Sequence, residues 1–319
     1  MLNTAGKNPV AKIAEIVDGC RRQVLPFANG RTAFKAFMVA AGLTSADEVL
    51  LPAYVGWSSR EGSGVFDPVA ELGLRYAFYR TNDRLEIDVE DAMAKIIAHR
   101  PRLLVLIHYF GFPDARAREL AEFARQHEVL VLEDEAHAML SDWIAGGCGR
   151  WGDGAIMSLH KLLPFPSGGL LVLNATAAGR EIGARLAGTA PSGQVFPFCD
   201  YDLYEIARRR RANANIALTT LSHLGAPVEP LYHSIPETVV PQTLPVLISG
   251  RPRDDIYFEM NSAGFGVVSL YHTLVAQIDG AAFPESHRLS RRIMNLPVHQ
   301  DAAADSIVAL VEHLAGLFE

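Results

Sequence analysis

Acidic, imidazole and lysine side chains gather in one stretch of the chain, between residues 129 and 174. Asp134 lies in an acidic cluster directly after a short apolar run, and Lys161 comes just after a second such run. Short apolar runs bounded by turn residues are typical of buried parallel strands, which present polar residues at their carboxyl ends. The sequence therefore predicts that the Asp134 carboxylate and the Lys161 amine belong to one site.

This pair of groups suits the chemistry of pyridoxal phosphate. The cofactor is an electron sink that forms a Schiff base with a lysine, and an acidic partner keeps its ring nitrogen protonated. Lys161 would form the Schiff base and then move the proton on the substrate carbon, while Asp134 would hold the ring nitrogen. His137 would reach the ring or its phenolic oxygen. Ser158 and His160 would offer hydrogen bonds to the phosphate.

Each of these residues also has a purely structural interpretation. A single lysine is usually a solvated surface charge, an aspartate at a strand end is often a helix cap, and residues 133–137 can form a solvated turn. The order and context of the residues together favour the catalytic interpretation. A metal site in the acidic cluster with His137 is disfavoured, because neighbouring strand residues point to opposite faces of a sheet.

The same stretch resembles the DegT/StrS-type aminotransferases, a family of fold-type I pyridoxal-phosphate enzymes that act on sugars and related carbonyl compounds. Residues 133–137 match the family signature Glu-Asp-x-Ala-(Gln or His). Residues 152–161 match its Gly-Asp-x-x-x-x-Ser-x-x-Lys segment. The Leu163-Pro164 pair followed by Gly168-Gly169 resembles a divergent branch of the family, and the resemblance extends over most of the chain.

The elements that must position these residues are predicted to alternate between strands and helices. Such alternation indicates βαβ units and a mostly parallel sheet, with sites at its carboxyl edge. The resemblance implies the fold-type I α/β architecture: a large cofactor-binding domain over residues 1–180, N-terminal helix included, and a small α+β domain over residues 181–319. The expected strands cover residues 49–54, 75–78, 103–107, 129–132 and 168–174, and the expected helices 11–22, 87–99 and 114–128.

A glycine turn at residues 27–34 leads into a predicted helix that stops at Gly42. The start of a helix carries free N–H groups and the positive end of the dipole, which together bind anions. The resemblance assigns phosphate binding to Gly30, Arg31 and Thr32, although Arg31 departs from the family pattern. An ordinary helix start is the alternative.

The resemblance also implies an aromatic side chain stacked on the pyridine face. Tyr54 and Trp57 both follow a predicted strand and are both candidates, and either can equally be a core residue. His108 ends another strand and resembles part of a His-x-Tyr-Gly segment of the family, so it is expected near the site only.

After residue 174 the pattern changes to that of a small α+β unit. Four successive arginines at residues 208–211 indicate either an anion or nucleotide patch, or a solvated helix face or inter-subunit pairing. The expected helices cover residues 175–187, 203–224, 254–263 and 302–317, the expected strands 241–250 and 267–274, and a loop 189–200.

Composition excludes several classes of protein. The chain has 319 residues, 49% of them hydrophobic, and a net charge of −7, which provides no basic footprint for nucleic acid. Its three cysteines show no metal-like or disulfide-like spacing, as expected in a reducing cytoplasm. The first residues lack an apolar signal region, and no run is long enough to cross a membrane.

The resemblance implies a pyridoxal-phosphate aminotransferase that moves an amino group from an amino acid donor to a keto substrate, and that works as a homodimer with sites between subunits. A keto-sugar nucleotide or another small carbonyl metabolite is the expected acceptor. One alternative is other chemistry on the same cofactor, by a lyase, cyclase or cysteine desulfurase; a desulfurase needs a nucleophilic thiol, for which Cys199 is the candidate. The other is an inert binding module, which has no need of both Asp134 and Lys161.

Overall fold

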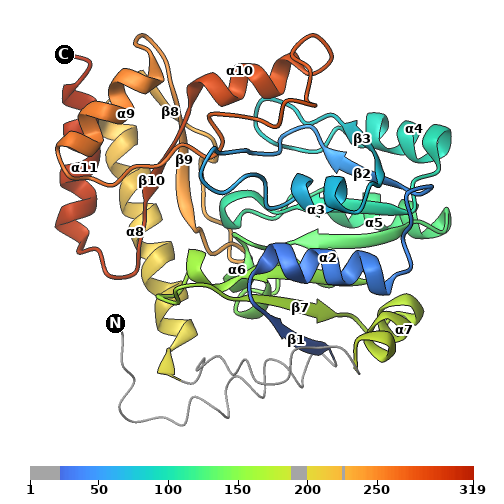
Figure 1. The fold of residues 1–319 in the computed structure, drawn as a ribbon. Coiled ribbons are helices and arrows are strands. Elements are labelled where there is room, and N and C mark those ends of the chain that lie inside the picture. The colour runs from blue at the N-terminus through green and yellow to red at the C-terminus, as the bar shows by residue number, and fades with distance from the viewer. Residues whose placement is uncertain (1–21, 188–199, 225–226) are drawn as a thin grey trace.

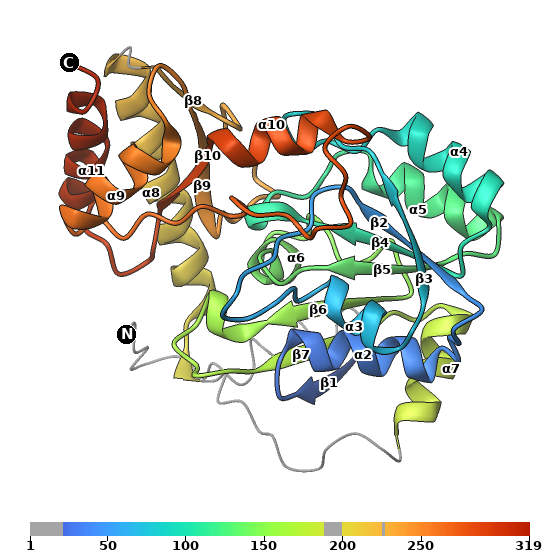
Figure 2. The same ribbon diagram turned by 45° about the horizontal axis from the view of Figure 1, so that its top comes forward.

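The computed structural model describes residues 22–187, 200–224 and 227–319 (Figure 1). Two expected elements lie almost wholly outside these ranges: the helix over residues 11–22 and the loop over residues 189–200. Cys20 and Cys199 also lie outside them. Two β-sheets organise the described chain, a large one of seven strands and a small one of three. Figures 1 and 2 show the small sheet at one end of the large one.

The large sheet has the order β1-β7-β6-β5-β4-β2-β3 and confirms the predicted mostly parallel α/β fold. Strands β3, β2, β4, β5 and β6 are parallel neighbours, whereas β7 is antiparallel to both β6 and β1. The strands span Gln23–Phe27 (β1), Glu48–Pro52 (β2), Arg75–Tyr79 (β3), Leu103–Ile107 (β4), Leu130–Asp134 (β5), Gly154–Ser158 (β6) and Gly169–Leu173 (β7).

Two features of this sheet were not predicted. The run at residues 168–174 was expected to be a parallel strand, but β7 is antiparallel because it follows β6 after a short connection, and a parallel return needs a crossover of a dozen or more residues. Strand β1 was not expected at all. It pairs along the outer edge of β7, from Gln23 opposite Leu173 to Phe27 opposite Gly169.

Alternate residues of the strands face two separate cores. Leu51 and Val105 pack with one face, where helices α2, α3 and α7 lie, while Leu50 and Leu104 pack with the other, under α4 and α5. The strands are therefore apolar on both faces, as expected of a buried parallel sheet. The helices span Gly30–Ala40 (α2), Phe66–Glu71 (α3), Val89–His99 (α4), Ala117–Gln126 (α5), Met139–Trp143 (α6) and Ala177–Leu186 (α7).

Helix starts follow the capping chemistry of the sequence. Asp88 caps α4 as predicted, because its side chain accepts a hydrogen bond from the Asp91 N–H at 3.0 Å. Helix α5 begins three residues later than expected. The Asp114 carboxylate accepts hydrogen bonds from the Ile87 and Arg116 N–H groups, so residues 114–116 form a turn before the helix.

The small sheet has the antiparallel order β10-β9-β8 and packs against three helices. The stretch 267–274 was expected to be a strand, but it forms only isolated β-bridges, between Val268 and Asn295 and between Leu274 and Gly56. Between these bridges its groups bond elsewhere: the Leu270 N–H donates to Asn295 Oδ1 and Ser269 Oγ to the Ile293 carbonyl. The elements span Leu203–Leu224 (α8), Val228–Pro230 (β8), Thr243–Ile248 (β9), Arg253–Ser262 (α9), Pro284–Arg292 (α10), Ile293–Pro297 (β10) and Ala304–Gly316 (α11).

The arginine run on α8 is used within the chain. Arg208 and Arg209 pair with Glu205 on the helix surface. Arg210 is buried and donates to the Gln242 carbonyl at 2.8 Å, and Arg211 donates to carbonyls of residues 236–239. These contacts favour the structural interpretation over an anion patch. Among the described helices, none combines the length and apolarity needed to cross a membrane.

Candidate active site

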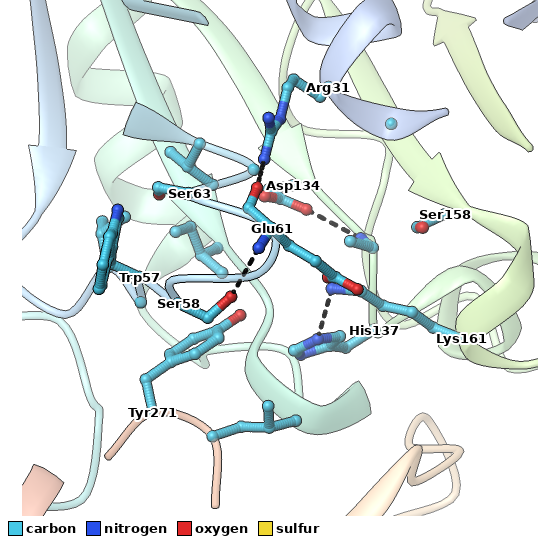
Figure 3. A pocket seen from close by; sticks show the side chains of 18 of the residues that line it. Arg31, Trp57, Ser58, Glu61, Ser63, Asp134, His137, Ser158, Lys161 and Tyr271 are labelled. Carbon is cyan, nitrogen blue, oxygen red and sulfur yellow. Dashed lines mark hydrogen bonds between the residues drawn. The ribbon is translucent and has the colours of Figure 1, made fainter. Parts of the chain in front are cut away.

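A cavity of about 710 Å³ lies at the carboxyl edge of the large sheet (Figure 3). Asp134 is the last residue of β5, Ser158 is the last of β6, and Lys161 ends the 3₁₀ turn Leu159–Lys161 (η2) that follows β6. All three line the cavity, together with His137. The structure thus brings together the acid and the lysine that the sequence placed after two separate strands.

Lys161 and His137 are joined by a short contact. Lys161 Nζ lies 2.9 Å from His137 Nε2, and the Phe110 N–H donates to His137 Nδ1 at 3.3 Å. A backbone N–H can only donate, so Nδ1 accepts and the proton of the neutral ring is on Nε2. That proton faces Lys161, whose nitrogen must then accept it with a lone pair. The geometry therefore matches a neutral imidazole beside a neutral amine.

Burial favours the same protonation states. It lowers the pKa of Lys161, against the opposing charges of Asp134 and Glu61. Burial also lowers the pKa of His137 well below its usual value, and the charge of Lys161 acts in the same direction. A lysine that loses its proton readily can act as a nucleophile and as a base.

Asp134 is a buried carboxyl held by its own turn. Its Oδ1 accepts from the Ala136 N–H at 2.8 Å. Burial raises its pKa, while the Ala136 hydrogen bond and the charge of Lys161 act in the opposite direction. Within the described part of the chain the second carboxylate oxygen makes no hydrogen bond, so it remains able to bind a protonated ring nitrogen.

His108 lines the cavity but is anchored away from it. Its Nε2 lies 3.0 Å from the Glu133 carboxylate, and both side chains are fully buried. Burial opposes ionisation of Glu133, but the His108 contact and the N–H groups of Gly152 and Gly149 outweigh it and lower the pKa of Glu133. This pair fixes the ends of β4 and β5 and holds His108 at the cavity wall.

The start of α2 forms one wall of the cavity. Asn29 caps the helix, accepting from the Thr32 N–H at 2.9 Å while Thr32 Oγ1 accepts from the Asn29 N–H at 3.2 Å. Gly30 and Arg31 line the cavity and carry the first N–H groups of the helix, which have no partner inside it. Thr32 is engaged in the capping box and is not among the lining residues.

The Arg31 side chain serves a neighbouring loop. It donates to the Glu61 carbonyl and lies 3.3 Å from the Asp67 carboxylate (Figure 3). Ser158 is a neighbour of the helix start, because a Cβ atom at Gly30 would lie 3.7 Å from Ser158 Cβ. Ser158 Oγ lies 3.3 Å from His160 Nδ1, and both residues line the cavity. The Gly30 and Arg31 N–H groups, Ser158 and His160 together surround a space suited to an anion.

The two predicted aromatic residues occupy different positions. Tyr54 is fully buried, and its hydroxyl accepts from the Tyr271 N–H at 2.8 Å and donates to the Tyr271 carbonyl at 3.2 Å. Trp57 is 45% exposed and, in Figure 3, lies at the far side of the cavity from Lys161.

Several residues that line the cavity were not predicted from the sequence. Glu61, Gln242 and the segment 268–273 all line the cavity, and Tyr271 reaches into it beside His137 (Figure 3). Segment 268–273 follows Lys161 by more than a hundred residues and carries no recognised motif, so no local pattern in the sequence indicated it.

The model of the DegT/DnrJ/EryC1/StrS aminotransferase family matches residues 11–185. A dTDP-4-dehydro-2,3,6-trideoxy-D-glucose 4-aminotransferase from Saccharopolyspora spinosa is 24% identical over 91% of this chain and 85% of that protein. GDP-perosamine synthase from Escherichia coli O157:H7 is 25% identical over 46% of this chain and 39% of that protein.

Solved structures share the fold. S. venezuelae DesV superimposes with a TM-score of 0.77 at 18% identity, covering 100% of this chain and 91% of that chain. The PLP form of Spr1654 from Streptococcus pneumoniae superimposes with a TM-score of 0.73 at 15% identity, covering 99% of this chain and 93% of that chain.

Proposed function

Because the chain belongs to the DegT/DnrJ/EryC1/StrS aminotransferase family, whose members use pyridoxal phosphate, we propose that it transfers an amino group from an amino acid to a keto-sugar nucleotide. The chain is a pyridoxal-phosphate-dependent aminotransferase by family. The proposal concerns its substrates and the residues that carry the reaction.

One observation carries the assignment of Lys161: its half-buried side chain lines the cavity, and its amine lies 2.9 Å from His137 Nε2. The cavity also fits the other parts of the cofactor. The Asp134 carboxyl suits the ring nitrogen, and the start of α2 with Ser158 suits the phosphate. The groups that would bind the aldehyde, the ring nitrogen and the phosphate of the cofactor thus line one cavity.

When bound, pyridoxal phosphate supplies an electron sink next to the reacting carbon. Lys161 would hold the cofactor and would carry the proton on and off the substrate carbon. Asp134 keeps the ring nitrogen protonated. His137 orients the Lys161 nitrogen, and the N–H groups at Gly30 and Arg31 bind the phosphate.

The proposed acceptor is supported by the relatives. The Saccharopolyspora spinosa relative is a dTDP-sugar 4-aminotransferase by name, and it aligns with 91% of this chain. A nucleotide sugar would extend from Lys161 toward the cavity mouth, where the indole of Trp57 is exposed. We also propose that the enzyme works as a homodimer.

The experiment compares the purified protein with Lys161→Met, and with Lys95→Met as the matched control on the surface of α4. The wild-type protein and the control should show visible absorbance from lysine-bound cofactor, and borohydride should fix the cofactor to the peptide that contains Lys161. Lys161→Met should show neither property. Borohydride labelling of another lysine would refute the assignment.

The substrate proposal is tested by adding amino acids and then dTDP- and GDP-linked 4-keto sugars. A donor such as glutamate should bleach the visible band while the cofactor stays bound, and a keto-sugar nucleotide should restore it. A band that all donors leave unchanged would favour lyase or desulfurase chemistry. Cys148 does not support a desulfurase, because burial raises the pKa of its thiol well above the usual value and it is not among the described lining residues.

A further inference from the structure

We propose that Tyr271 is the aromatic side chain that packs on the pyridine ring of the cofactor, and that Gly56 exists to admit it. The inference rests on the proposed function, because it names a contact of the same cofactor. Tyr271 takes the role for which the sequence indicated Tyr54 or Trp57.

Tyr54 also lines the cavity, but its contacts favour a supporting role over that of the stacking residue. Its ring is fully buried, and its hydroxyl bonds both the N–H and the carbonyl of Tyr271. The Tyr54 and Tyr271 rings lie 5.9 Å apart at 48°, so neither stacks on the other. Tyr54 therefore fixes the backbone of residue 271 and leaves the Tyr271 ring available.

The Tyr271 ring fills the space beside Gly56. A Cβ atom at Gly56 would lie 2.0 Å from Tyr271 Cδ1 and 2.3 Å from Cγ, far closer than any real contact. The backbone on both sides holds this arrangement: the Trp57 N–H donates to the Thr273 carbonyl at 3.1 Å, and the Val275 N–H to the Val55 carbonyl at 2.9 Å. Residue 56 must be glycine for the ring to sit there.

The Tyr271 ring faces the reacting groups. It lies 6.3 Å from the His137 ring, with 27° between the planes, and His137 contacts Lys161. Figure 3 shows Tyr271 entering the cavity from the C-terminal part of the chain, between Ser58 and His137. A flat aromatic ring held between Asp134 and Lys161 would thus meet the Tyr271 phenol, and offset stacking of such rings is favourable.

The phenol stays protonated in this position. Burial raises the pKa of Tyr271 well above its usual value, and the charge of Asp134 acts in the same direction. Within the described residues the hydroxyl has no hydrogen-bond partner, whereas the Tyr271 backbone is fully engaged. The ring, rather than the hydroxyl, is therefore the part that the proposal assigns to cofactor binding.

The experiment measures equilibrium affinity for pyridoxal phosphate and the induced circular dichroism of the bound cofactor. Tyr271→Leu should lose about tenfold in affinity, the size of an aromatic contact of about 1.4 kcal/mol, and should change the dichroism. Tyr271→Phe keeps the ring and should bind within about twofold of wild type. Phe258→Leu changes an aromatic residue that is 66% exposed on α9 and does not line the cavity, so it is the control and should bind normally.

Gly56→Ala provides the second arm. Its methyl group should displace the Tyr271 ring and lower affinity by a similar factor. In a Tyr271→Ala background, which removes Cγ and the ring, the same change should have almost no further effect, because the three atoms nearest to the added Cβ all belong to the ring. Additive losses would overturn the proposal, and so would a Tyr271→Leu variant that binds cofactor like wild type. Wild-type protein that binds no pyridoxal phosphate would instead refute the proposed function.

Discussion

The contact between His137 and Lys161 depends on one backbone amide, the N–H of Phe110. The Phe110 N–H that bonds His137 belongs to a residue with φ of +58°, a conformation that is unusual for a residue other than glycine. Such strain is retained where the surroundings hold it, and here the Gln242 N–H bonds the Phe110 carbonyl at 2.7 Å. The amide thereby selects the ring tautomer that faces Lys161.

The lowered pKa of Lys161 should have a measurable effect on the free energy of unfolding. Its pKa is lowered in the folded protein, so between that value and about 10.4 the unfolded chain binds more protons than the folded one. The contribution of Lys161 to the stability of the cofactor-free protein therefore rises with pH across this window. We expect cofactor-free Lys161→Met to be more stable than wild type at neutral pH, with the difference shrinking as the pH approaches 10.

Urea denaturation at a series of pH values measures this effect. Lys95→Met is the control, because Lys95 lies on the surface of α4 and pairs with Asp91. Its stability should follow the wild-type pH profile. Equal pH profiles for Lys161→Met and wild type would show that the amine is not buried in solution.

At the scale of elements, the start of α2 depends on a close approach by β7. A Cβ atom at Gly169 would lie 2.2 Å from the Asn29 carbonyl carbon, so only glycine lets β7 pass the helix start. The pairing of Phe27 with Gly169 then places Asn29 and Gly30 at the cavity wall. A strand edge and a helix cap together build the proposed phosphate site.

The Asn29 cap can be tested by substitution. Asn29→Ala removes the acceptor for the Thr32 N–H and should reduce the free energy of unfolding by about 1 kcal/mol. It should also weaken cofactor binding, because the N–H groups of the first turn lose their fixed direction. Thermal denaturation and cofactor titration measure both effects.

Asn29→Ser is the matched control for this test, since serine is an equally good cap. It should retain most of the stability and affinity. If Asn29→Ala lost stability while its cofactor affinity stayed at the wild-type value, the start of α2 would not be the phosphate site.

For the whole molecule, α8 connects the two sheets. Its first part packs with the core under β6 and β7 through Leu203 and Ile206, and its second part packs with the small sheet through Ala214 and Ala217. Arg210 lies between these parts, and burial lowers its pKa to about 10. The division of the chain into domains near residue 180 stays a proposal, and α7 runs across that point.

Arg210 also supports the site from a distance. It donates to the Gln242 carbonyl at 2.8 Å, and the Gln242 N–H bonds Phe110, whose own N–H bonds His137. Arg210→Met should leave buried carbonyls without a donor and lower the free energy of unfolding by about 2 kcal/mol. It should also reduce transaminase turnover, because the support of His137 is weakened.

Arg209→Met is the control on the neighbouring surface position, and its stability should stay within about 0.5 kcal/mol of wild type. Chemical denaturation and initial rates measure the two variants side by side. Equal stability of Arg210→Met and Arg209→Met would mean that the buried arginine contributes nothing.

Local patterns in the sequence determined the strands that end in Asp134 and precede Lys161, the helix start at Gly30 and the cap at Asp88. These features follow from apolar periodicity and capping chemistry, which act over a few residues. The resemblance to a family rested on two such local motifs, and the family match confirmed it.

Only the tertiary structure decided the direction of β7, the engagement of Thr32 in a capping box and the close packing of Tyr271 against Gly56. Each depends on a contact between segments that are separated along the chain or on a competition between hydrogen bonds. The packing of Tyr271 against Gly56 joins residues more than two hundred positions apart, and no local pattern encodes a contact of that kind.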